Sequence, residues 1–396
     1  MNPTRFCVVC VDGAADEPVG GLDGRTVLEA AATPNLDALV RAGRLGMMRT
    51  IPAGLPASGD VAMLSLAGYD PRGGYTGIGP LEAAALCMRL KPREVVLRCD
   101  LVTIADGLLV DANGGDIPTE QASALMAELN TRLSSAGAVF ETVAGSHHLL
   151  RLRDMSDAAT KTLPPFQIEG EAVQRHAPRG PGAARLVELM QQAGDVLAAH
   201  DVNTVRRDLG ENPANAIWLW GGGPFPRWPR FRQRFGIGAA AVGNALFFKG
   251  IAKMVHWAYV PAPRDGAAET ASLAHAALQA LADHAMVVVH AGMVDEASLA
   301  GDIDAKQRAI EMIDRDLIGP LADRLGGFHR WRLLVASSLM SSVERRRHSD
   351  DAVPFCMCGA GISAGGQADR LTERAASSSD LQIEFGHELM EFFLRT

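Results

Sequence analysis

The sequence predicts a doubly wound α/β core that carries an inserted, smaller α+β domain. Short apolar runs that end in polar or glycine residues indicate buried parallel strands, and apolar residues at three- and four-residue spacing indicate helices between several of them. The block from about Leu86 to Leu189 is richer in strands than its flanks. With 396 residues, 47% of them hydrophobic, the chain is long enough for two domains. We therefore expect a core formed by residues 1–85 and 190–396, and an insert formed by residues 86–189.

The first predicted strand runs from Phe6 to Val11 and is followed directly by Asp12 and Gly13. Open α/β sheets carry their chemistry at the carboxyl ends of their strands, so Asp12 occupies a position suited to a functional side chain. Thr33-Pro34 then begins a helix that continues through Leu39, because it combines an N-cap with a proline at the first helical position.

The remaining elements are predicted from the same two patterns. Further core strands are expected at Ala216–Trp220, Val255–Val260, Ala285–His290, Trp331–Ser337 and Val353–Cys358. Core helices are expected at Glu269–His284, Asp302–Leu325 and Leu381–Leu394. In the insert, strands at Glu94–Ile104 and His147–Leu152 are expected to surround a helix at Thr119–Ala136.

Composition excludes several classes of function. A formal charge of −8 and a pI near 5.8 disfavour a nucleic-acid binder, which usually needs a basic surface to neutralise phosphates. No apolar run approaches the roughly 20 residues that span a bilayer, and the first residues do not resemble a signal peptide. We therefore expect a cytoplasmic protein with no membrane or nucleic-acid partner. The sequence identifies no protein partner.

Several segments in order along the chain resemble the archaeal type of cofactor-independent phosphoglycerate mutases. They are VDGAADEPVGGLDGRTVLEAAATPNLDAL, LSLAGYDPRGGYTGIGPLEA, NPANAIWLWGGG, VDEASLAGDIDAKQRAIEMIDRDLIGPL and HSDDAVPF, and they are spread from Val11 to Phe355, so the resemblance extends over nearly the whole chain. The resemblance implies an alkaline-phosphatase-like core.

Members of that family interconvert 3-phosphoglycerate and 2-phosphoglycerate, a step of glycolysis, through a phosphoserine intermediate. The resemblance implies two divalent ions that activate the serine and neutralise the charge of the transferring group. Carboxylates and imidazoles are the ligands that such ions accept. Seven protein ligands are implied, counting the serine.

The nucleophile position of the family matches a glycine here. The family pattern Gly-Ser-Asp-Val-Ala precedes Gly-Tyr-Asp-Pro, which places its aspartate at Asp60 and its serine at Gly59. Ser58 is a weak substitute, because a shift of one residue moves the Cα by about 3.8 Å and redirects the side chain. No intact catalytic residue is therefore expected.

The other six implied ligands are only half retained. Those that remain are Asp12, Asp295 and His348, whereas Leu299, Ser338 and Leu339 stand where relatives have a histidine, an aspartate and a histidine. The retained residues also have structural explanations: Asp12 can cap a loop, Asp295 can stabilise a helix start, and His348 follows an arginine run typical of a solvated face. We expect no firmly held cofactor, and at most one divalent ion (manganese, magnesium or zinc) at a remnant site.

Four further residues are candidates for contact with substrate. Lys249 matches a lysine in a similar Lys-Gly-Ile run of the family, although a surface lysine is an equally good explanation. Arg98 and His148 match basic or polar positions in the insert, and Asp60 follows the nucleophile position. The expected ligand is a phosphorylated small acid.

Three functions remain open on the sequence. The first is a degenerate homologue, inactive or strongly impaired, that acts by binding. The alternative is an active phosphoglycerate mutase or phosphatase with a rearranged metal site, built from Ser58 and nearby acids. A different enzyme on the same scaffold is a third possibility, but no new set of nucleophile, base and orienting residue supports it.

Overall fold

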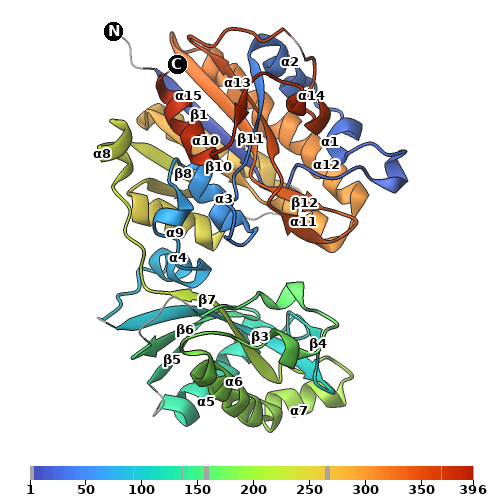
Figure 1. Ribbon diagram of the computed structural model, residues 1–396, viewed down its shortest axis with the longest axis vertical. Coiled ribbons are helices and arrows are strands. Elements are labelled where there is room, and N and C mark those ends of the chain that lie inside the picture. Colours follow the sequence, from blue (N-terminus) through green and yellow to red (C-terminus); the bar gives the residue numbers. More distant parts are fainter. Residues whose placement is uncertain are drawn as a thin grey trace. The chain divides into compact units, whose positions relative to one another are not determined.

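The computed structural model describes residues 4–91, 93–134, 137–155, 160–263, 268–366 and 368–395. The chain divides into two compact units. Unit 1 comprises Met1–Tyr75 and Arg227–Thr396, and unit 2 comprises Thr76–Pro226. Both units combine helices with sheets (Figure 1), so the predicted α/β fold class is confirmed.

Unit 1 is built on an eight-stranded sheet with the order β15-β2-β14-β11-β1-β10-β8-β9. Its strands are β1 (Arg5–Val11), β2 (Arg44–Met48), β8 (Ala239–Gly243), β9 (Ala258–Pro261), β10 (Met286–Ala291), β11 (Trp331–Ser337), β14 (Val353–Gly359) and β15 (Gln382–Ile383). A separate two-stranded hairpin consists of β12 (Met340–Ser342) and β13 (Arg347–Ser349). The central strand β1 is parallel to both neighbours, with Val11 opposite Ala291 and Ser337. The residues that follow these three strands therefore gather at one edge of the sheet.

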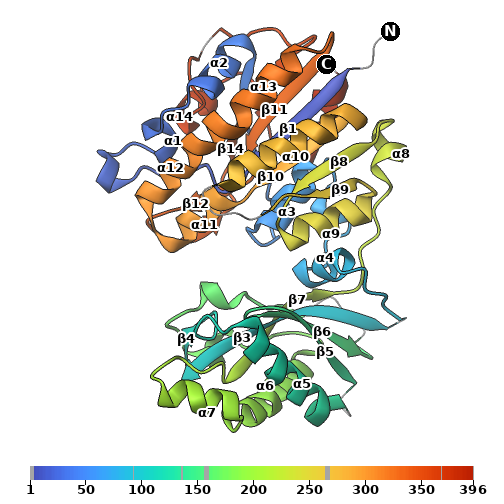
Figure 2. The same cartoon turned by 180° about the vertical axis from the view of Figure 1, so that it is seen from behind.

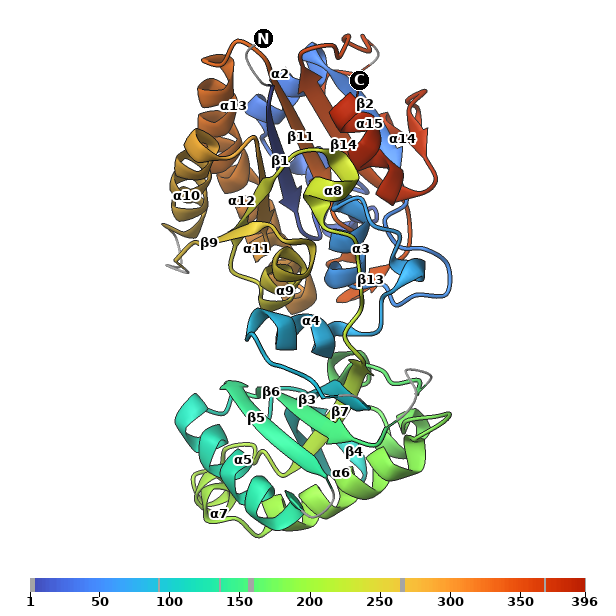
Figure 3. The same cartoon turned by 90° about the vertical axis from the view of Figure 1, so that its left-hand side faces the viewer.

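Helices cover both faces of this sheet. They are α1 (Val27–Ala30), α2 (Pro34–Ala42), α3 (Gly59–Leu66), α8 (Phe231–Phe235), α9 (Leu246–Val255), α10 (Glu269–Asp283), α11 (Met293–Ala300), α12 (Ile303–Ile313), α13 (Gly319–Gly326), α14 (Glu373–Ser377) and α15 (Leu389–Arg395), with 3-10 turns at Gly20–Leu22, Pro71–Gly73 and Gly386–Glu388. Alternate residues of β1 point to opposite faces. Cys7 and Val9 join a core cluster with α10, α12 and α13, whereas Phe6 contacts Phe393 of α15. Figure 3 shows α10 and α13 on one side of the sheet and α15 on the other.

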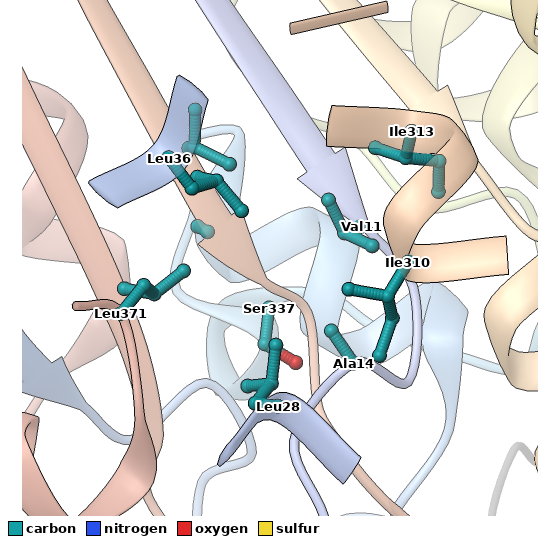
Figure 4. Close-up of a pocket in the computed structure, with 10 residues that line it drawn as sticks. Val11, Ala14, Leu28, Leu36, Ile310, Ile313, Ser337 and Leu371 are labelled. Carbon is teal, nitrogen blue, oxygen red and sulfur yellow. The ribbon is translucent and has the colours of Figure 1, made fainter. Parts of the chain in front are cut away.

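A small cavity with an apolar lining lies beside the carboxyl ends of β1 and β11. Figure 4 shows Leu28, Leu36, Ile310 and other apolar side chains around a cavity of about 10 Å³ at this position. Ser337 is a polar residue in the lining, but its hydroxyl donates to the carbonyl of Leu339 at 3.0 Å. The lining of this small cavity is therefore almost wholly apolar.

Unit 2 is an antiparallel sheet covered by helices. Its elements are α4 (Ile78–Ala85), β3 (Glu94–Ala105), β4 (Leu108–Asp111), α5 (Thr119–Leu133), β5 (Ala138–Ala144), β6 (His147–Arg153), α6 (Ala183–Ala198), α7 (Asp201–Asp208) and β7 (Ala216–Gly223), with 3-10 turns at Pro165–Gln167 and Val173–His176. The long strand β3 pairs with β4, β6 and β7. Residues of α5 and α6 share one core cluster with β3 (Figure 2). Unit 2 thus has a hydrophobic core of its own.

The unit boundaries differ from the bounds expected from the sequence. Helix α4 and residues 190–226 belong to unit 2, so that unit is larger than the expected insert of residues 86–189. The strand predicted at Ala216–Trp220 forms, but it pairs with β3 of unit 2 rather than with the core sheet. Its apolar pattern fits either sheet, and only the long-range pairing assigns it.

Three predicted core elements also need correction. The strand predicted from Val255 begins only at Ala258, because Val255 ends α9 and His256 has a positive φ of 62°. The helix predicted at Leu381–Leu394 is instead the short strand β15, a 3-10 turn and α15. The helix predicted at Asp302–Leu325 contains a π-helical segment at Asp314–Ile318. Pro320 follows that segment and lacks the N–H that a regular α-helix needs there.

The helix predicted at Thr119–Ala136 forms as α5 and ends at Leu133. Its last two predicted residues lie outside the described ranges. Over the part of the chain that the structure describes, none of the helices combines the length and the apolar character needed to cross a bilayer.

Candidate functional site

Asp12 lies at the centre of the site in unit 1, at the carboxyl end of β1. Its carboxylate is buried and accepts a very short hydrogen bond from the hydroxyl of Ser338, the residue that follows β11. The same hydroxyl accepts a hydrogen bond of 3.3 Å from the backbone N–H of Gly13. The parallel register of β1 and β11 produces this contact, because it ends both strands at the same edge.

His290 is a second partner of Asp12 and was not predicted from the sequence. It lies near the end of β10, and its Nε2 is 3.1 Å from Oδ2 of Asp12. Phe248 stacks on its ring at 5.2 Å, and Phe247 packs edge-on at 5.3 Å. Burial opposes ionisation of Asp12, but the hydrogen bonds from His290 and Ser338 outweigh it and lower the pKa of the carboxyl. A polar residue inside the apolar run MVVVHA was the only signal in the sequence.

Asp295 and His348 form the other polar pair of the site. Asp295 is in the first turn of α11, and its Oδ1 is 2.9 Å from Nε2 of His348 on β13. Burial alone would lower the pKa of His348, but the neighbouring Asp295 carboxylate raises it overall. A Cβ atom at Gly13 would lie 2.7 Å from Oδ1 of Asp295, so this pair adjoins the loop that follows Asp12. Glycine at residue 13, with φ +69°, permits this close approach.

Gly59 begins α3 directly opposite Asp12. A Cβ atom on Gly59 would lie 3.0 Å from Oδ2 of Asp12 and 3.4 Å from Cζ of Phe247. The neighbouring Ser58 occupies the N-cap position without a side-chain capping hydrogen bond. Asp60 is buried and accepts a hydrogen bond of 2.7 Å from the hydroxyl of Tyr75. Burial raises the pKa of the Asp60 carboxyl.

Leu299 and Leu339 stand at two positions where the resemblance implies histidine. Leu339 is fully buried in an apolar cluster with Ile51, Val61 and Ala62. Leu299 is half-buried near the end of α11, one turn after Asp295. Their side chains contribute packing and offer no ligand atom to a cation.

The two polar pairs determine what the site can hold. In a two-ion centre each ion is held by about three protein ligands, which are usually carboxylates or imidazoles. Among the residues that the structure describes, no group of three or more His, Cys, Asp and Glu side chains gathers in this way. Asp12 is occupied by His290 and Ser338, and His348 is occupied by Asp295. Asp12, Asp295 and His348, the residues that the resemblance implies would hold an ion, therefore all have protein partners in this structure.

The three basic candidates have different surroundings. Lys249 is half-buried on α9, with its Nζ 5.7 Å from the ring centroid of Tyr259. Arg98 lies in unit 2 between two buried acids, with Nη1 at 2.6 Å from Glu82 and Nε at 2.9 Å from Asp100. These carboxylates neutralise its guanidinium.

His148 lies in the interior of unit 2 rather than on its surface. Its Nδ1 accepts a hydrogen bond of 3.2 Å from the backbone N–H of Val143, and its Nε2 is buried without a partner among the described residues. Burial lowers the pKa of His148 to about 4. Such a residue fits a role in the structure of unit 2 better than direct contact with substrate.

Asp12, Asp295 and His348 lie beyond the carboxyl ends of the central parallel strands, which is where proteins with open α/β sheets place their ligand-binding and catalytic residues. A family model for 2,3-bisphosphoglycerate-independent phosphoglycerate mutase matches residues 40–203. The mutase of Methanothrix thermoacetophila is 36% identical, with 98% of this chain and 99% of the relative covered. A mutase of Methanothermobacter thermautotrophicus is 38% identical, with 100% and 98% covered. The chain therefore belongs to the 2,3-bisphosphoglycerate-independent phosphoglycerate mutase family.

Solved structures agree with this fold. The PH0037 protein of Pyrococcus horikoshii superposes with a TM-score of 0.79 at 24% identity, with 100% of this chain and 97% of that chain covered. The cofactor-independent phosphoglycerate mutase of Thermoplasma acidophilum superposes with a TM-score of 0.60 at 24% identity, with 99% of both chains covered. At this level of identity these likenesses support the fold alone.

Family membership corrects the cofactor expectation. From the sequence we expected no firmly held cofactor and at most one divalent ion. The full-length relatives are phosphoglycerate mutases, a family for which the resemblance implies metal-dependent chemistry, and nothing in these comparisons sets this chain apart from them. The expectation is therefore wrong. That expectation inferred the cofactor content of the whole protein from the residues found at individual ligand positions.

Proposed function

We propose that this member of the family has lost, or retains only in strongly impaired form, the interconversion of 3-phosphoglycerate and 2-phosphoglycerate, and that it acts by binding a phosphorylated small acid. The observation that carries the proposal is Gly59, because the family reaction proceeds through a phosphoserine and glycine has no hydroxyl. Losing a nucleophile typically costs several powers of ten in rate.

The space for that hydroxyl is also restricted. Asp12 lies close to the position that a Cβ atom on residue 59 would take, and Phe247 borders the same position. His290 and Ser338 hold the Asp12 carboxylate from two sides. A serine at residue 59 would therefore compete with an existing network.

Ser338 does not replace the missing nucleophile. Its hydroxyl contacts Asp12, and Asp12 in turn contacts His290, so the carboxylate stands between the hydroxyl and the imidazole. In a serine–histidine–aspartate triad the imidazole takes the proton of the hydroxyl directly. The order found here gives Ser338 no adjacent histidine base.

Lys249 supports the binding part of the proposal. It lies on α9, the helix that also carries Phe247 of the site, and its Nζ is 5.7 Å from the ring centroid of Tyr259, whose hydroxyl donates to the carbonyl of Gly243. Lys249 as a residue is half-buried, and the attraction of a partly buried cation to an anion is screened less than at a fully exposed position. We propose that Lys249 binds the phosphate or carboxylate of the ligand, and that the remaining metal ligands are Asp12, Asp295 and His348.

The decisive experiment is a coupled assay for conversion of 3-phosphoglycerate in the presence of manganese, with bound metal measured on the same sample. We expect turnover to lie several powers of ten below that of the Methanothermobacter thermautotrophicus relative. Measuring the metal separates a missing nucleophile from a missing cofactor. Turnover near the rate of the relative would overturn the loss of activity and favour a rearranged active site.

Binding is tested by titration calorimetry with 3-phosphoglycerate. We expect Lys249→Ala to weaken binding about tenfold or more, because it removes a half-buried cation. Lys253→Ala is the matched control, since Lys253 lies on the same helix and is exposed. Equal affinities of the two variants would reject the role of Lys249. A cytoplasmic location stays a prediction, and fractionation of cells would test it.

A further inference from the structure

A cavity of about 380 Å³ lies in unit 1, away from the site around Asp12. Its lining residues are Val40, Gly43, Arg44, Leu45, Gly365, Gly366, Ala368, Thr372, Arg374, Ala375, Ser378, Ser379 and Asp380. Arg44 begins β2 and pairs with Met357, next to the end of β14 at Gly359. Gly359 in turn lies opposite Arg332, near the start of β11. The Arg44 side of the cavity therefore lies toward the amino end of β11, whereas Asp12 follows the carboxyl end of β1.

We propose that this cavity is a second small-molecule site, which binds a small metabolite carrying a carboxylate or a phosphate. Three of its lining residues are charged: Arg44 and Arg374 are positive, and Asp380 is negative. Arginine presents a planar fork of donors that matches the oxygens of either anion. Its volume lies within the range of small-ligand sites, about 300–1,000 Å³.

Both arginines are available to a ligand at little cost. Nη2 of Arg44 is 2.9 Å from Asp380, whose side chain is 69% exposed. Nε of Arg374 is 3.0 Å from Glu29, and the Arg374 side chain is 77% exposed. Each pair has one well-exposed partner, although Arg44 is only 31% and Glu29 only 14% exposed, and pairs that reach the solvent in this way contribute on the order of 1 kcal/mol. An anion that enters the cavity can therefore replace one or both partners.

The rest of the lining fits the non-ionic part of such a ligand. Val40 and Leu45 are buried and form an apolar floor with two alanines. The hydroxyl of Thr372 accepts the N–H of Ala375 at 3.1 Å, which leaves its own proton as a donor. A Cβ atom at residue 365 would lie 3.5 Å from Cδ of Arg44, an ordinary van der Waals distance, so Gly365 lies directly beside the arginine.

Titration calorimetry on the full-length protein tests the proposal, with inorganic phosphate, glycerate and 3-phosphoglycerate as separate probes. We expect at least one probe to bind, and the double variant Arg44→Ala/Arg374→Ala to raise its dissociation constant about tenfold or more. Inorganic phosphate and glycerate distinguish a phosphate site from a carboxylate site. Absence of binding by all three probes to the wild-type protein would overturn the proposal.

Two further variants keep the result interpretable. Arg315→Ala/Arg395→Ala removes the same charge from two exposed surface pairs and should bind like the wild type. Arg44→Lys/Arg374→Lys keeps the charge and should weaken binding less than the alanine pair, which protects the test if the alanine variant folds poorly. Binding that is lost in Lys249→Ala but unchanged in both arginine variants would place the anion at the Asp12 site and reject the second site.

Discussion

A single carboxylate, Asp12, links the changes at the residue scale. Gly59 removes a side chain in front of it, and Ser338 supplies a hydroxyl beside it. His290 contributes a further hydrogen bond from β10. These contacts satisfy both carboxylate oxygens within the protein, so Asp12 is now part of an internal polar network. Substitutions at one position of this network therefore act on the others.

Restoring the nucleophile alone tests this coupling. We expect Gly59→Ser to leave turnover in the manganese-containing assay within about tenfold of the wild type, because the new side chain must displace Asp12 and three implied ligands remain replaced. Gly59→Ala serves as the matched control, since it adds the same Cβ atom without the hydroxyl. A gain of several powers of ten from serine alone would show that the site is otherwise complete.

His148 gives unit 2 a defined pH dependence. Its pKa is about 4 in the folded protein, against 6.5 for an unperturbed histidine. Between these two values the unfolded chain binds the additional proton, so stability falls as the pH is lowered from about 6.5 to about 4, and the loss approaches 3 kcal/mol. We expect urea unfolding, followed by the fluorescence of the unit 2 tryptophans Trp218 and Trp220, to show this loss.

His148→Leu should remove most of that pH dependence. The variant cannot take up a proton at residue 148 in either state, although the N–H of Val143 loses its acceptor. The relevant measurement is therefore how the free energy of unfolding changes with pH, and not its value at neutral pH. An unchanged slope between pH 4 and 6.5 would assign the acid sensitivity to other groups.

At the scale of elements, a buried ion pair joins three parts of unit 1. Lys306 of α12 is fully buried, and its Nζ donates to Oδ2 of Asp16 and to the carbonyl of Ser341, both at 2.7 Å. Asp16 lies in the segment after β1, and Ser341 lies in β12. Burial lowers the pKa of Lys306, and the nearby Asp16 carboxylate opposes that change. The pair fixes the β12–β13 hairpin, and so His348, relative to the end of β1.

Breaking this pair should be costly. We expect Lys306→Met to lower the free energy of unfolding by about 3–5 kcal/mol, because Asp16 then stays buried without its cation. The double variant Lys306→Met/Asp16→Asn should recover part of the loss, since the stranded charge is gone. Lys253→Met, at an exposed lysine, is the control. Urea unfolding of Lys306→Met within 1 kcal/mol of the wild type would contradict this role.

At the scale of the whole molecule, the four positions that the resemblance implies are replaced come from segments far apart in the sequence. Gly59 begins α3, Leu299 lies on α11, and Ser338 and Leu339 follow β11. Leu339 packs in an apolar cluster with Ile51, Val61 and Ala62. We therefore expect activity to return only when several of these positions are changed together, because a nucleophile and the groups that stabilise its reaction contribute to the rate as a unit.

The fourfold variant Gly59→Ser/Leu299→His/Ser338→Asp/Leu339→His tests this view. We expect it to gain turnover that none of the single variants shows, and to be less stable than the wild type because a histidine replaces a fully buried leucine. Thermal unfolding with and without manganese, run beside the coupled assay, measures both effects. A fourfold variant that folds and remains inactive would place the defect outside these positions.

Much of the architecture is visible in local patterns. The strand from Phe6 to Val11, the helix that begins at Pro34 and the position of Asp12 at a strand end all follow from apolar runs, caps and prolines. The family resemblance, carried by ordered segments, predicted departures at Gly59, Leu299, Ser338 and Leu339, and these stay predictions. These features depend on residues close together in the sequence.

Other features depend on the tertiary structure. Strand β7 has the same apolar character as the core strands, and only its pairing with β3 assigns it to unit 2. His290 could not be matched to Asp12 before β10 was known to lie beside β1. The burial of His148 likewise depends on the elements that pack around it.

The sequence by itself thus determined the fold class and the family, because these are properties of local order and residue identity, whereas the substituted ligand positions stay a prediction. Only the tertiary structure decided which side chains satisfy Asp12, where unit 2 begins and ends, and which basic residues are neutralised by acids. The physical reason is that hydrogen bonds, burial and charge act through space, between segments that the chain brings together only when it folds.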